Sequence, residues 1–399
     1  MYDKASLALI PSGYKAGSTD NLYSVLPANG DGDFNATRGS TATRVNKDGL
    51  IETVATNVPR LDYPLTNGVV GDCPHLLLEP SRRNLATDSK LALLTGGSSG
   101  SISTTGDGAS TDVTLSNGLT GKKITVSSSG RSYLNITCTV VSGTEYTVSI
   151  FVENYLGASQ SNFIDILSGG GGEDFSSDLI SNGRIQGTFT ATSTSVTIRV
   201  GHGTTSTRTG FFSANISGIQ LEDGGSGIDA TYATSLIHTT GIIETRSADE
   251  CNSSGTSAEF NDSEGVLFAE ISALANDGTT REMAISDGGA SNRIEIRYIS
   301  SANDIQAVIR GASSTIILTY NVTDVTEFTK VAVKYKSEDY ALWVGGVERD
   351  VSITSGTPTG LNELAFDDGN GTFNMYGKCK QLIYFNEALS DSELQTLTS

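Results

Sequence analysis

Short runs in which apolar and polar residues alternate with period two recur along most of this 399-residue chain. Such alternation places successive side chains on opposite faces of a β-strand, so that one face packs on a core and the other meets solvent. The clearest run predicts a core face made of every second residue: Tyr146, Val148, Ile150 and Val152. The residues between them are expected to face outward or toward a partner: Thr147, Ser149 and Phe151.

Composition favours an all-β fold of short strands and tight turns. The chain contains 45 glycines, 18% charged residues and 37% hydrophobic residues. Many glycine turns between short strands are typical of sandwiches and barrels, and this hydrophobic content excludes a disordered chain. We therefore expect an irregular N-terminal region at 1–88, a jelly-roll β-sandwich at 89–235, a linker at 236–260 and a second β-sandwich at 261–399.

A short helix is expected at the C-terminal end of the sequence. Ser390 followed by Glu393 forms a capping box, the pairing in which each side chain satisfies a backbone N–H at the start of a helix. Leu394 and Leu397 are three positions apart and share one helix face. The sequence therefore predicts one capped helix with an apolar side.

Charge and cysteine spacing exclude several classes of protein. The net charge is −19, and residues 240–399 hold 11 basic against 24 acidic residues. Nucleic-acid binding needs clustered Lys and Arg, so we expect no such partner. No run of about 18 apolar residues predicts a membrane span. The widely separated cysteines are expected to be free thiols rather than zinc ligands: Cys73, Cys138, Cys251 and Cys379.

The N-terminal region combines prolines with arginines and carboxylates. Four of the seven prolines lie between positions 59 and 80, where they fix turns and remove backbone donors. Order is therefore expected from bonds between arginine side chains and carboxylates or carbonyls. A solvated surface loop is the alternative reading, although an irregular segment this long is usually functional or packed. The residues we expect to dock this region on other proteins are Arg44, Arg60, Asp62, Tyr63, Glu79 and Arg82.

Four phrases of this region, at 38–46, 48–52, 59–63 and 76–85, resemble in order and spacing the N-terminal region of a family of tailed-bacteriophage virion proteins. One departure is the second arginine in Arg82-Arg83-Asn84-Leu85, where such proteins usually have Arg-Thr-Asn-Leu. The resemblance implies a virion component, assembled in the host cytoplasm, with capsid, portal or tail proteins as partners. It leaves head and tail open as the location.

Two further resemblances concern the sandwiches. Residues 216–224, followed by Thr245-Arg246-Ser247-Ala248-Asp249, are similar to the end of galactose-binding-like, carbohydrate-binding jelly rolls of phage structural proteins. Residues 330–347 and the strand and helix at 379–397 resemble concanavalin A-like, laminin-G-like lectin domains. Together they imply lectin-like modules that bind glycans.

Sugar binding needs exposed aromatic rings beside polar groups, and the candidates are Asn154, Tyr155, Tyr340 and Arg349. Trp343, in the middle of a strand, is expected in the core instead. No cofactor is required, but calcium is one reading of a loop whose oxygen ligands would be Asp367, Asp368 and Asn370. A plain turn is the other reading, because Asp, Asn and Gly favour turns.

No catalysis is expected. The Glu-x-Asp-x-x-Glu strand of concanavalin-like glucanases is absent, and Glu270 and Glu295 each stand alone in sequence. The first functional hypothesis is a fibre or tail-associated adhesin on the virion surface that binds host surface glycans. The alternatives are a capsid or tail decoration protein with a purely structural role and, third, an enzyme acting on polysaccharide. A homo-oligomer is expected, although no heptad or β-helix repeat specifies one.

Overall fold

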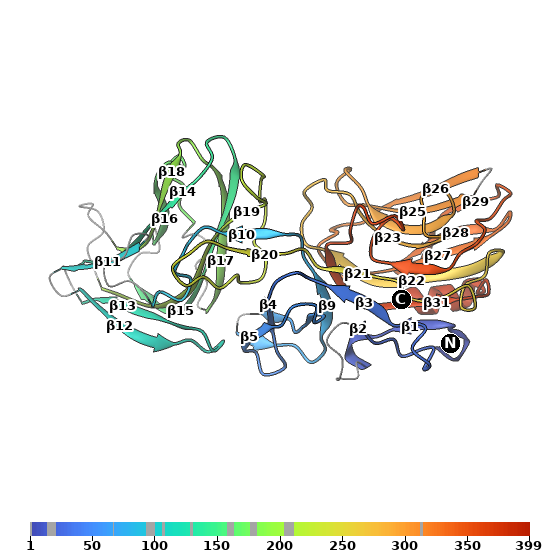
Figure 1. The fold of residues 1–399 in the computed structure, drawn as a ribbon, viewed down its shortest axis with the longest axis horizontal. Helices are drawn as coiled ribbons and strands as arrows, with labels where there is room; N and C mark the ends of the chain where they lie inside the picture. Colours follow the sequence, from blue (N-terminus) through green and yellow to red (C-terminus); the bar gives the residue numbers. More distant parts are fainter. Residues whose placement is uncertain are drawn as a thin grey trace.

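The computed structural model describes residues 2–13, 21–66, 68–92, 100–105, 108–127, 131–157, 163–175, 182–202, 211–311 and 314–399. Two β-sandwiches lie side by side, and the N-terminal strands run beneath and between them (Figure 1). A single α-helix among these residues, α1 (Asp391–Thr398), ends the chain. The prediction of an all-β fold is confirmed.

The first sandwich packs a large sheet against a four-stranded sheet. The large sheet is formed by β12 (Gly108–Thr114), β13 (Thr120–Val126), β15 (Glu145–Gly157), β17 (Asn182–Thr190), β19 (Phe212–Asp223), β10 (Arg82–Asn84) and β20 (Glu244–Arg246). The facing sheet is formed by β11 (Gly100–Thr105), β14 (Arg131–Thr139), β16 (Ile164–Ser168) and β18 (Ser195–His202). β19 is the centre of the large sheet, since β15 lies along one edge and β13 and β10 share the other.

The second sandwich also has two sheets. Its larger sheet contains β1 (Leu7–Leu9), β6 (Leu61–Asp62), β9 (His75–Leu78), β22 (Glu264–Ala273), β27 (Thr329–Lys336), β28 (Tyr340–Val344), β29 (Val347–Ser352) and β31 (Gly377–Phe385). The facing sheet contains β23 (Arg281–Ser286), β24 (Arg293–Tyr298), β25 (Asp304–Gly311), β26 (Ser314–Asn321) and β30 (Glu363–Ala365).

Period-two alternation correctly predicts the core of the first sandwich. The four apolar residues expected on the inner face of β15 are all buried in one hydrophobic cluster: Tyr146, Val148, Ile150 and Val152. On the opposite face, the Thr147 hydroxyl donates to the Ala230 carbonyl at 2.6 Å, so this face meets the segment that follows β19 rather than open water. Thr147 and Ser149 are therefore buried by the chain itself, so the prediction that they face outward is wrong.

The N-terminal region differs from the expected separate segment, because its strands belong to the sheets of both sandwiches. β1 and β9 both pair with β31, while β10 pairs with β19. The rest forms small sheets at the junction: β3 (Phe34–Thr37) with β2 (Asn21–Leu22) and β21 (Glu250–Asn252), the hairpin of β4 (Ala42–Val45) and β5 (Ile51–Val54), and the hairpin of β7 (Leu65–Thr66) and β8 (Val69–Val70). Two 3₁₀ turns, η1 (Tyr2–Lys4) and η2 (Pro11–Gly13), flank β1.

The C-terminal helix forms with the predicted cap. The Ser390 N–H donates to the Glu393 carboxylate at 2.9 Å, and the box is complete in both directions. Leu394 and Leu397 pack with Trp343 in a buried cluster on the larger sheet of the second sandwich, which confirms Trp343 as a core residue. All four cysteines are free thiols, as predicted. No helix in the described part of the chain is long and apolar enough to cross a membrane.

Candidate binding cleft between the two sandwiches

A buried ionic cluster lies where the chain passes from one sandwich to the other. Glu79 lies between β9 and β10 and is 3% exposed. Its carboxylate accepts a hydrogen bond from Arg60 Nη1 at 2.6 Å and lies 2.8 Å from Arg246 Nη1. Asp249 binds the other side of Arg60 and accepts from Arg38 Nη1 at 2.9 Å. Three arginines therefore share two carboxylates out of contact with water.

Backbone N–H and carbonyl groups also bond within this ionic cluster. The Glu79 N–H donates to the Asp249 carboxylate at 2.9 Å, and the Asp249 N–H donates to the Glu79 carbonyl at 2.9 Å. Ser235 donates to Glu79 from its N–H at 2.7 Å and from its hydroxyl at 2.6 Å. Burial alone would raise the pKa of Glu79, but the guanidinium groups of Arg246 and Arg60 outweigh it and hold this pKa well below its usual range. Glu79 is therefore ionised at neutral pH.

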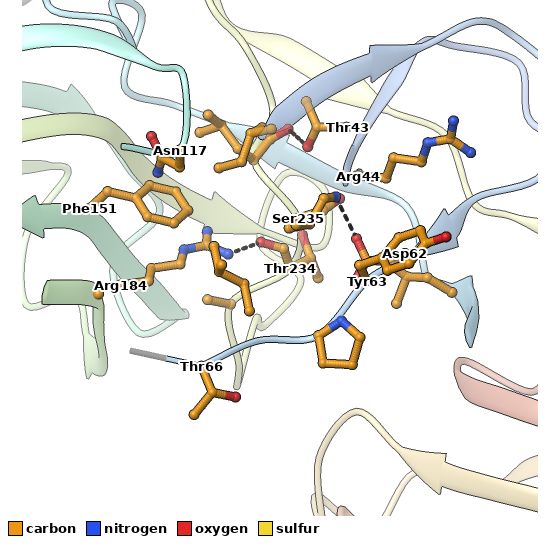
Figure 2. A pocket seen from close by; sticks show the side chains of 18 of the residues that line it. Thr43, Arg44, Asp62, Tyr63, Thr66, Asn117, Phe151, Arg184, Thr234 and Ser235 are labelled. Carbon is orange, nitrogen blue, oxygen red and sulfur yellow. Dashed lines mark hydrogen bonds between the residues drawn. The ribbon is translucent and has the colours of Figure 1, made fainter. Parts of the chain in front are cut away.

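A cleft of about 610 Å³ opens beside the cluster, between the two sandwiches and the N-terminal region. Figure 2 shows Phe151, Arg184 and Asn117 on one side and Tyr63 and Asp62 on the other. Thr234 and Ser235, from the segment that covers the outer face of β15, lie between these two sides. Phe328, Lys378 and His75 line the part of the cleft formed by the second sandwich.

Arg184 on β17 reaches into the cleft, and among the described residues no carboxylate pairs with it. Its guanidinium donates to the Thr234 carbonyl at 2.5 Å and to the Ser149 hydroxyl at 2.7 Å, and it lies 5.4 Å from the ring centre of Phe151. Both hydrogen-bond acceptors are neutral groups. The buried Nε atom has no hydrogen-bond partner. Burial lowers the pKa of Arg184, and the charge of buried Glu222 opposes this shift.

His75 lies under the opposite end of the cleft. It is 2% exposed, and neither ring nitrogen has a hydrogen-bond partner. Its Nε2 lies 3.5 Å from an oxygen of Asp62, and its ring packs edge-on against Phe328 at 5.7 Å. Burial and the nearby charge of Lys378 lower the pKa of His75 to about 3, so this imidazole is neutral. Burial raises the pKa of Asp62 to about 6 despite a hydrogen bond from the Val45 N–H.

The acidic side chains of the cleft already accept hydrogen bonds. Glu153 accepts from the N–H of Ser116 at 2.9 and 3.0 Å and from the Ser116 hydroxyl. These bonds hold the turn between β12 and β13, whose Asn117 carbonyl accepts from the Ile51 N–H at 2.9 Å. The turn of the first sandwich is thereby fixed against β5, and the two form one wall of the cleft.

The predicted docking residues separate into two groups. Arg44, Asp62 and Tyr63 line the cleft, as does one edge of Glu79. Arg60 is wholly buried and Glu79 nearly so, which leaves them no surface for contact with another protein. Arg82 is also buried, with its guanidinium 5.2 Å from the ring centre of Tyr232. Bonds from arginines to carboxylates and carbonyls do order this region, as predicted. For Arg60, Glu79 and Arg82, however, these bonds lie inside the protein and not at a surface that could dock on another protein.

The predicted sugar-binding residues lie outside the cleft, in two separate places. Asn154 and Tyr155 lie near the C-terminal end of β15, where Asn154 is exposed and Tyr155 is half-buried. The ring centres of Tyr155 and Phe163 are 5.0 Å apart. Arg349 on β29 is exposed and stacks 4.3 Å from the ring centre of Tyr320. Tyr340 was expected to be accessible and is instead 1% exposed, because it faces the core from β28 and its hydroxyl donates to the Gly356 carbonyl.

The predicted calcium loop is folded as a hydrogen-bonded turn. Asp367 accepts from the Gly369 N–H at 2.7 Å, and Asp368 accepts from the N–H groups of Asn370 and Thr372 at 3.0 and 2.9 Å. Arg293 lies 3.3 Å from Asp368. Among the described residues, no three or more His, Cys, Asp or Glu side chains are grouped to hold a metal ion. Calcium at this loop stays a prediction.

A second charged cluster lies on the outer face of the facing sheet of the second sandwich. Glu295, which appeared isolated in sequence, lies near Glu282 of the adjacent strand, and Arg297 bridges them at 3.7 and 3.4 Å. Burial and the charge of Glu282 raise the pKa of Glu295 to about 7. Glu295 also contacts Arg293 and is fully buried. The carboxylates are therefore paired but closed to a substrate in this structure.

Sequence reasoning missed most of the cleft. Phe151 had a usable signal, since it occupies an outward-facing position of an otherwise regular strand. Arg184, His75 and Lys378 had none, because they come from three distant strands and no local pattern connects them. Asn117 lies in an ordinary-looking turn, and only the contact of that turn with β5 reveals its place.

No protein-family model and no curated protein match the sequence. Among solved structures, similarity is found to the CBM40 of Ruminococcus gnavus IT-sialidase bound to α2,3-sialyllactose, at 13% identity over 35% of this chain and 84% of that chain, with a TM-score of 0.31. Domain 4 of AbnA, a GH43 extracellular arabinanase from Geobacillus stearothermophilus, in complex with arabinotriose, gives 11% identity, 44% and 83% coverage, and a TM-score of 0.32. Domains LG4–5 of the mouse laminin α1 chain give 8% identity, 64% and 90% coverage, and a TM-score of 0.24. At these values the similarities support no inference about ligand or activity.

Proposed function

We propose that this chain is a non-enzymatic virion surface protein, a fibre or tail-associated adhesin, that binds glycans of the host surface. The observation that carries the binding role is the cleft between the sandwiches. Its volume of about 610 Å³ is in the range of small-molecule sites, roughly 300–1,000 Å³. The virion assignment is supported by the resemblance of residues 38–85 to phage virion proteins.

The lining of the cleft suits a saccharide. Sugar rings have apolar faces and polar edges, so their sites combine aromatic rings with a few fixed polar groups. Tyr63 and Phe151 offer rings from opposite sides (Figure 2). Gln186, which is exposed, offers an amide. The ionic cluster fixes the segment that carries Ser235, so this part of the cleft is held in place by bonds within the chain. A preformed site avoids part of the entropy cost of ordering on binding.

Glycan-array binding by the full chain tests the proposal. Phe151→Ala removes an aromatic wall and should reduce binding at least tenfold, whereas Phe211→Ala, which removes a half-exposed ring of the same sandwich outside the cleft, should not. If both variants bind glycans equally tightly, the cleft is not the glycan-binding site. Absence of binding to any host surface by the unmodified chain would favour the structural role instead.

A purely structural role is the second candidate, and one observation favours it. The N-terminal strands join both sandwiches, and the buried ionic cluster of Arg60, Glu79 and Asp249 fastens the junction, which is suited to a rigid particle component. A particle reconstruction would show where the chain lies and its copy number. For the enzyme alternative, the test is release of reducing sugar from host polysaccharide, with Glu295→Gln as the control for the buried carboxylate pair.

A further inference from the structure

We propose that the cleft selects acidic glycans, saccharides with an ionised carboxylate, and that Arg184 and Lys378 bind this anionic group. The inference rests on the proposed glycan-binding function and adds the chemical class of the ligand. The charges of the cleft carry it. Arg184 and Lys378 have no carboxylate partner among the described residues, whereas the acidic side chains beside them already accept hydrogen bonds.

Arg184 is the first part of the argument. Its two hydrogen-bond acceptors are a backbone carbonyl and a serine hydroxyl, so no carboxylate pairs with it directly. Glu222 acts on it from a distance, but that carboxylate accepts from Thr234 at 3.0 Å and lies fully buried behind it. A half-buried guanidinium carries a desolvation cost that an ion pair normally offsets. Its planar group of donors fits a carboxylate in two-point contact.

Lys378 supplies the second cation, from the other side of the cleft. It extends from β31, is half-buried and forms no ion pair with the part of the chain that the structure describes. Its charge lowers the pKa of His75 and also opposes the raised pKa of Asp62, so it lies within electrostatic reach of both. His75 itself is neutral, and both of its ring nitrogens are buried, so it adds no charge to this side of the cleft.

The acidic side chains do not cancel these cations within the cleft. Glu153 is occupied by Ser116, and Glu79 by Arg60 and Arg246. Asp62, the third carboxylate of the lining, accepts from the Val45 N–H at 2.7 Å and lies 3.5 Å from His75, and among the described residues it forms no ion pair with Arg184 or Lys378. The chain as a whole has a net charge of −19, which repels anions at long range. Attraction to an anionic ligand must therefore come from short-range contacts inside the cleft, where Arg184 and Lys378 can distinguish it from a neutral ligand.

The test uses the full chain on an array of uronate oligosaccharides, each printed as the free acid and as its methyl ester, beside neutral oligosaccharides. Esterification removes the charge and keeps the sugar ring. We expect free acids to bind at least tenfold more tightly than their esters, and this preference to disappear in Arg184→Gln and in Lys378→Gln. Lys378 forms no ion pair, so Lys378→Gln should fold even if Arg184→Gln does not.

Lys123→Gln is the matched control, because Lys123 is exposed on β13 away from the cleft and carries the same charge. It should keep the preference for free acids. If acids, esters and neutral oligosaccharides bind equally tightly, this inference is overturned. The glycan-binding function still stands in that case, provided that Phe151→Ala reduces the binding. No binding to any member of the array would count against both. A preference for acids that survives Lys378→Gln would also overturn the assignment of the anionic group to these residues.

Discussion

Arg60 joins two carboxylates from distant parts of the chain and is completely buried. We expect Arg60→Met to lower the free energy of unfolding by about 3–5 kcal/mol, because removing one partner leaves Glu79 and Asp249 buried with less compensation. Urea unfolding at pH 7 measures this loss. Arg44→Met is the control: Arg44 pairs with Glu52 in contact with solvent, and its loss should cost under about 1 kcal/mol. A similar loss of unfolding free energy in the two variants would show that the buried ion pairs stabilise the fold no more than an exposed pair does.

The pKa of Asp62, raised to about 6 by burial, gives a pH-dependent prediction. A carboxyl whose folded pKa exceeds its unfolded value of 3.8 favours folding fully below pH 3.8, and this contribution disappears as the pH rises through about 6. Asp62→Asn keeps a neutral acceptor for the Val45 N–H. It should therefore stabilise the chain by about 1–2 kcal/mol at pH 7.5 and by almost nothing at pH 4. Urea unfolding at both pH values measures the difference, and an equal effect at both would contradict the raised pKa.

At this scale the sequence predicts that arginines and carboxylates order residues 38–82, but not which of them form ion pairs or with which partners. Arg60, Asp62 and Glu79 were all identified as ordering residues. Asp249, which binds Arg60, lies 189 positions away, and no local pattern brings two such residues together. Whether a charged residue is exposed also depends on the fold around it, which is why Arg60 and Tyr340 were expected at the surface and are buried.

Among the elements, β31 depends on the N-terminal strands. It pairs with β22 along one edge, and β9 and β1 share the other. Removing residues 1–88 would therefore expose that edge, and it would also remove the buried Leu7, Leu9 and Leu76 from the core of the second sandwich. We expect residues 89–399 alone to aggregate or to show a much reduced β signal in circular dichroism and size-exclusion chromatography. A monomeric, fully folded truncated chain would contradict this dependence.

The docking prediction for residues 1–88 needs a different experiment for the same reason. Deletion would confuse loss of docking with loss of folding, so substitutions at half-buried cleft residues of this region, such as Arg44→Glu, are the cleaner choice.

Among elements, alternation predicted the long strands and the capping box predicted α1. The two- and three-residue strands such as β1 and β10 carry too little pattern to detect.

For the whole molecule, we expect one cooperative thermal transition in calorimetry, because both sandwiches share the N-terminal strands and the ionic cluster. Asp249→Ala removes the acceptor that joins Arg38 and Arg60. It should lower the transition temperature and separate the sandwiches into two transitions. Asp112→Ala is the control, since Asp112 is an exposed partner of Lys122 in the first sandwich and its loss should leave a single transition. Two transitions in the unmodified chain would show that the junction does not couple the sandwiches.

The sequence predicts two β-sandwiches well and their arrangement poorly. Fold class follows from period and composition, which are local properties. The cleft depends on how strands such as β9 and β10, three residues apart, turn from one sheet to the other. Its lining comes from both sandwiches and the N-terminal region, so it exists only at the level of the assembled chain.

The pairing of the first strand with the last also sets an order of events during synthesis. Ser6 contacts Tyr384 across 378 positions of the chain. At roughly 5–20 residues per second, a ribosome needs on the order of tens of seconds to make that distance. The first sandwich can close in that interval, since its last strand ends at Arg246. β6 can pair with β9 at once, but β1 and β9 keep an unpaired edge until β31 emerges, which exposes these two strands to wrong pairing during synthesis.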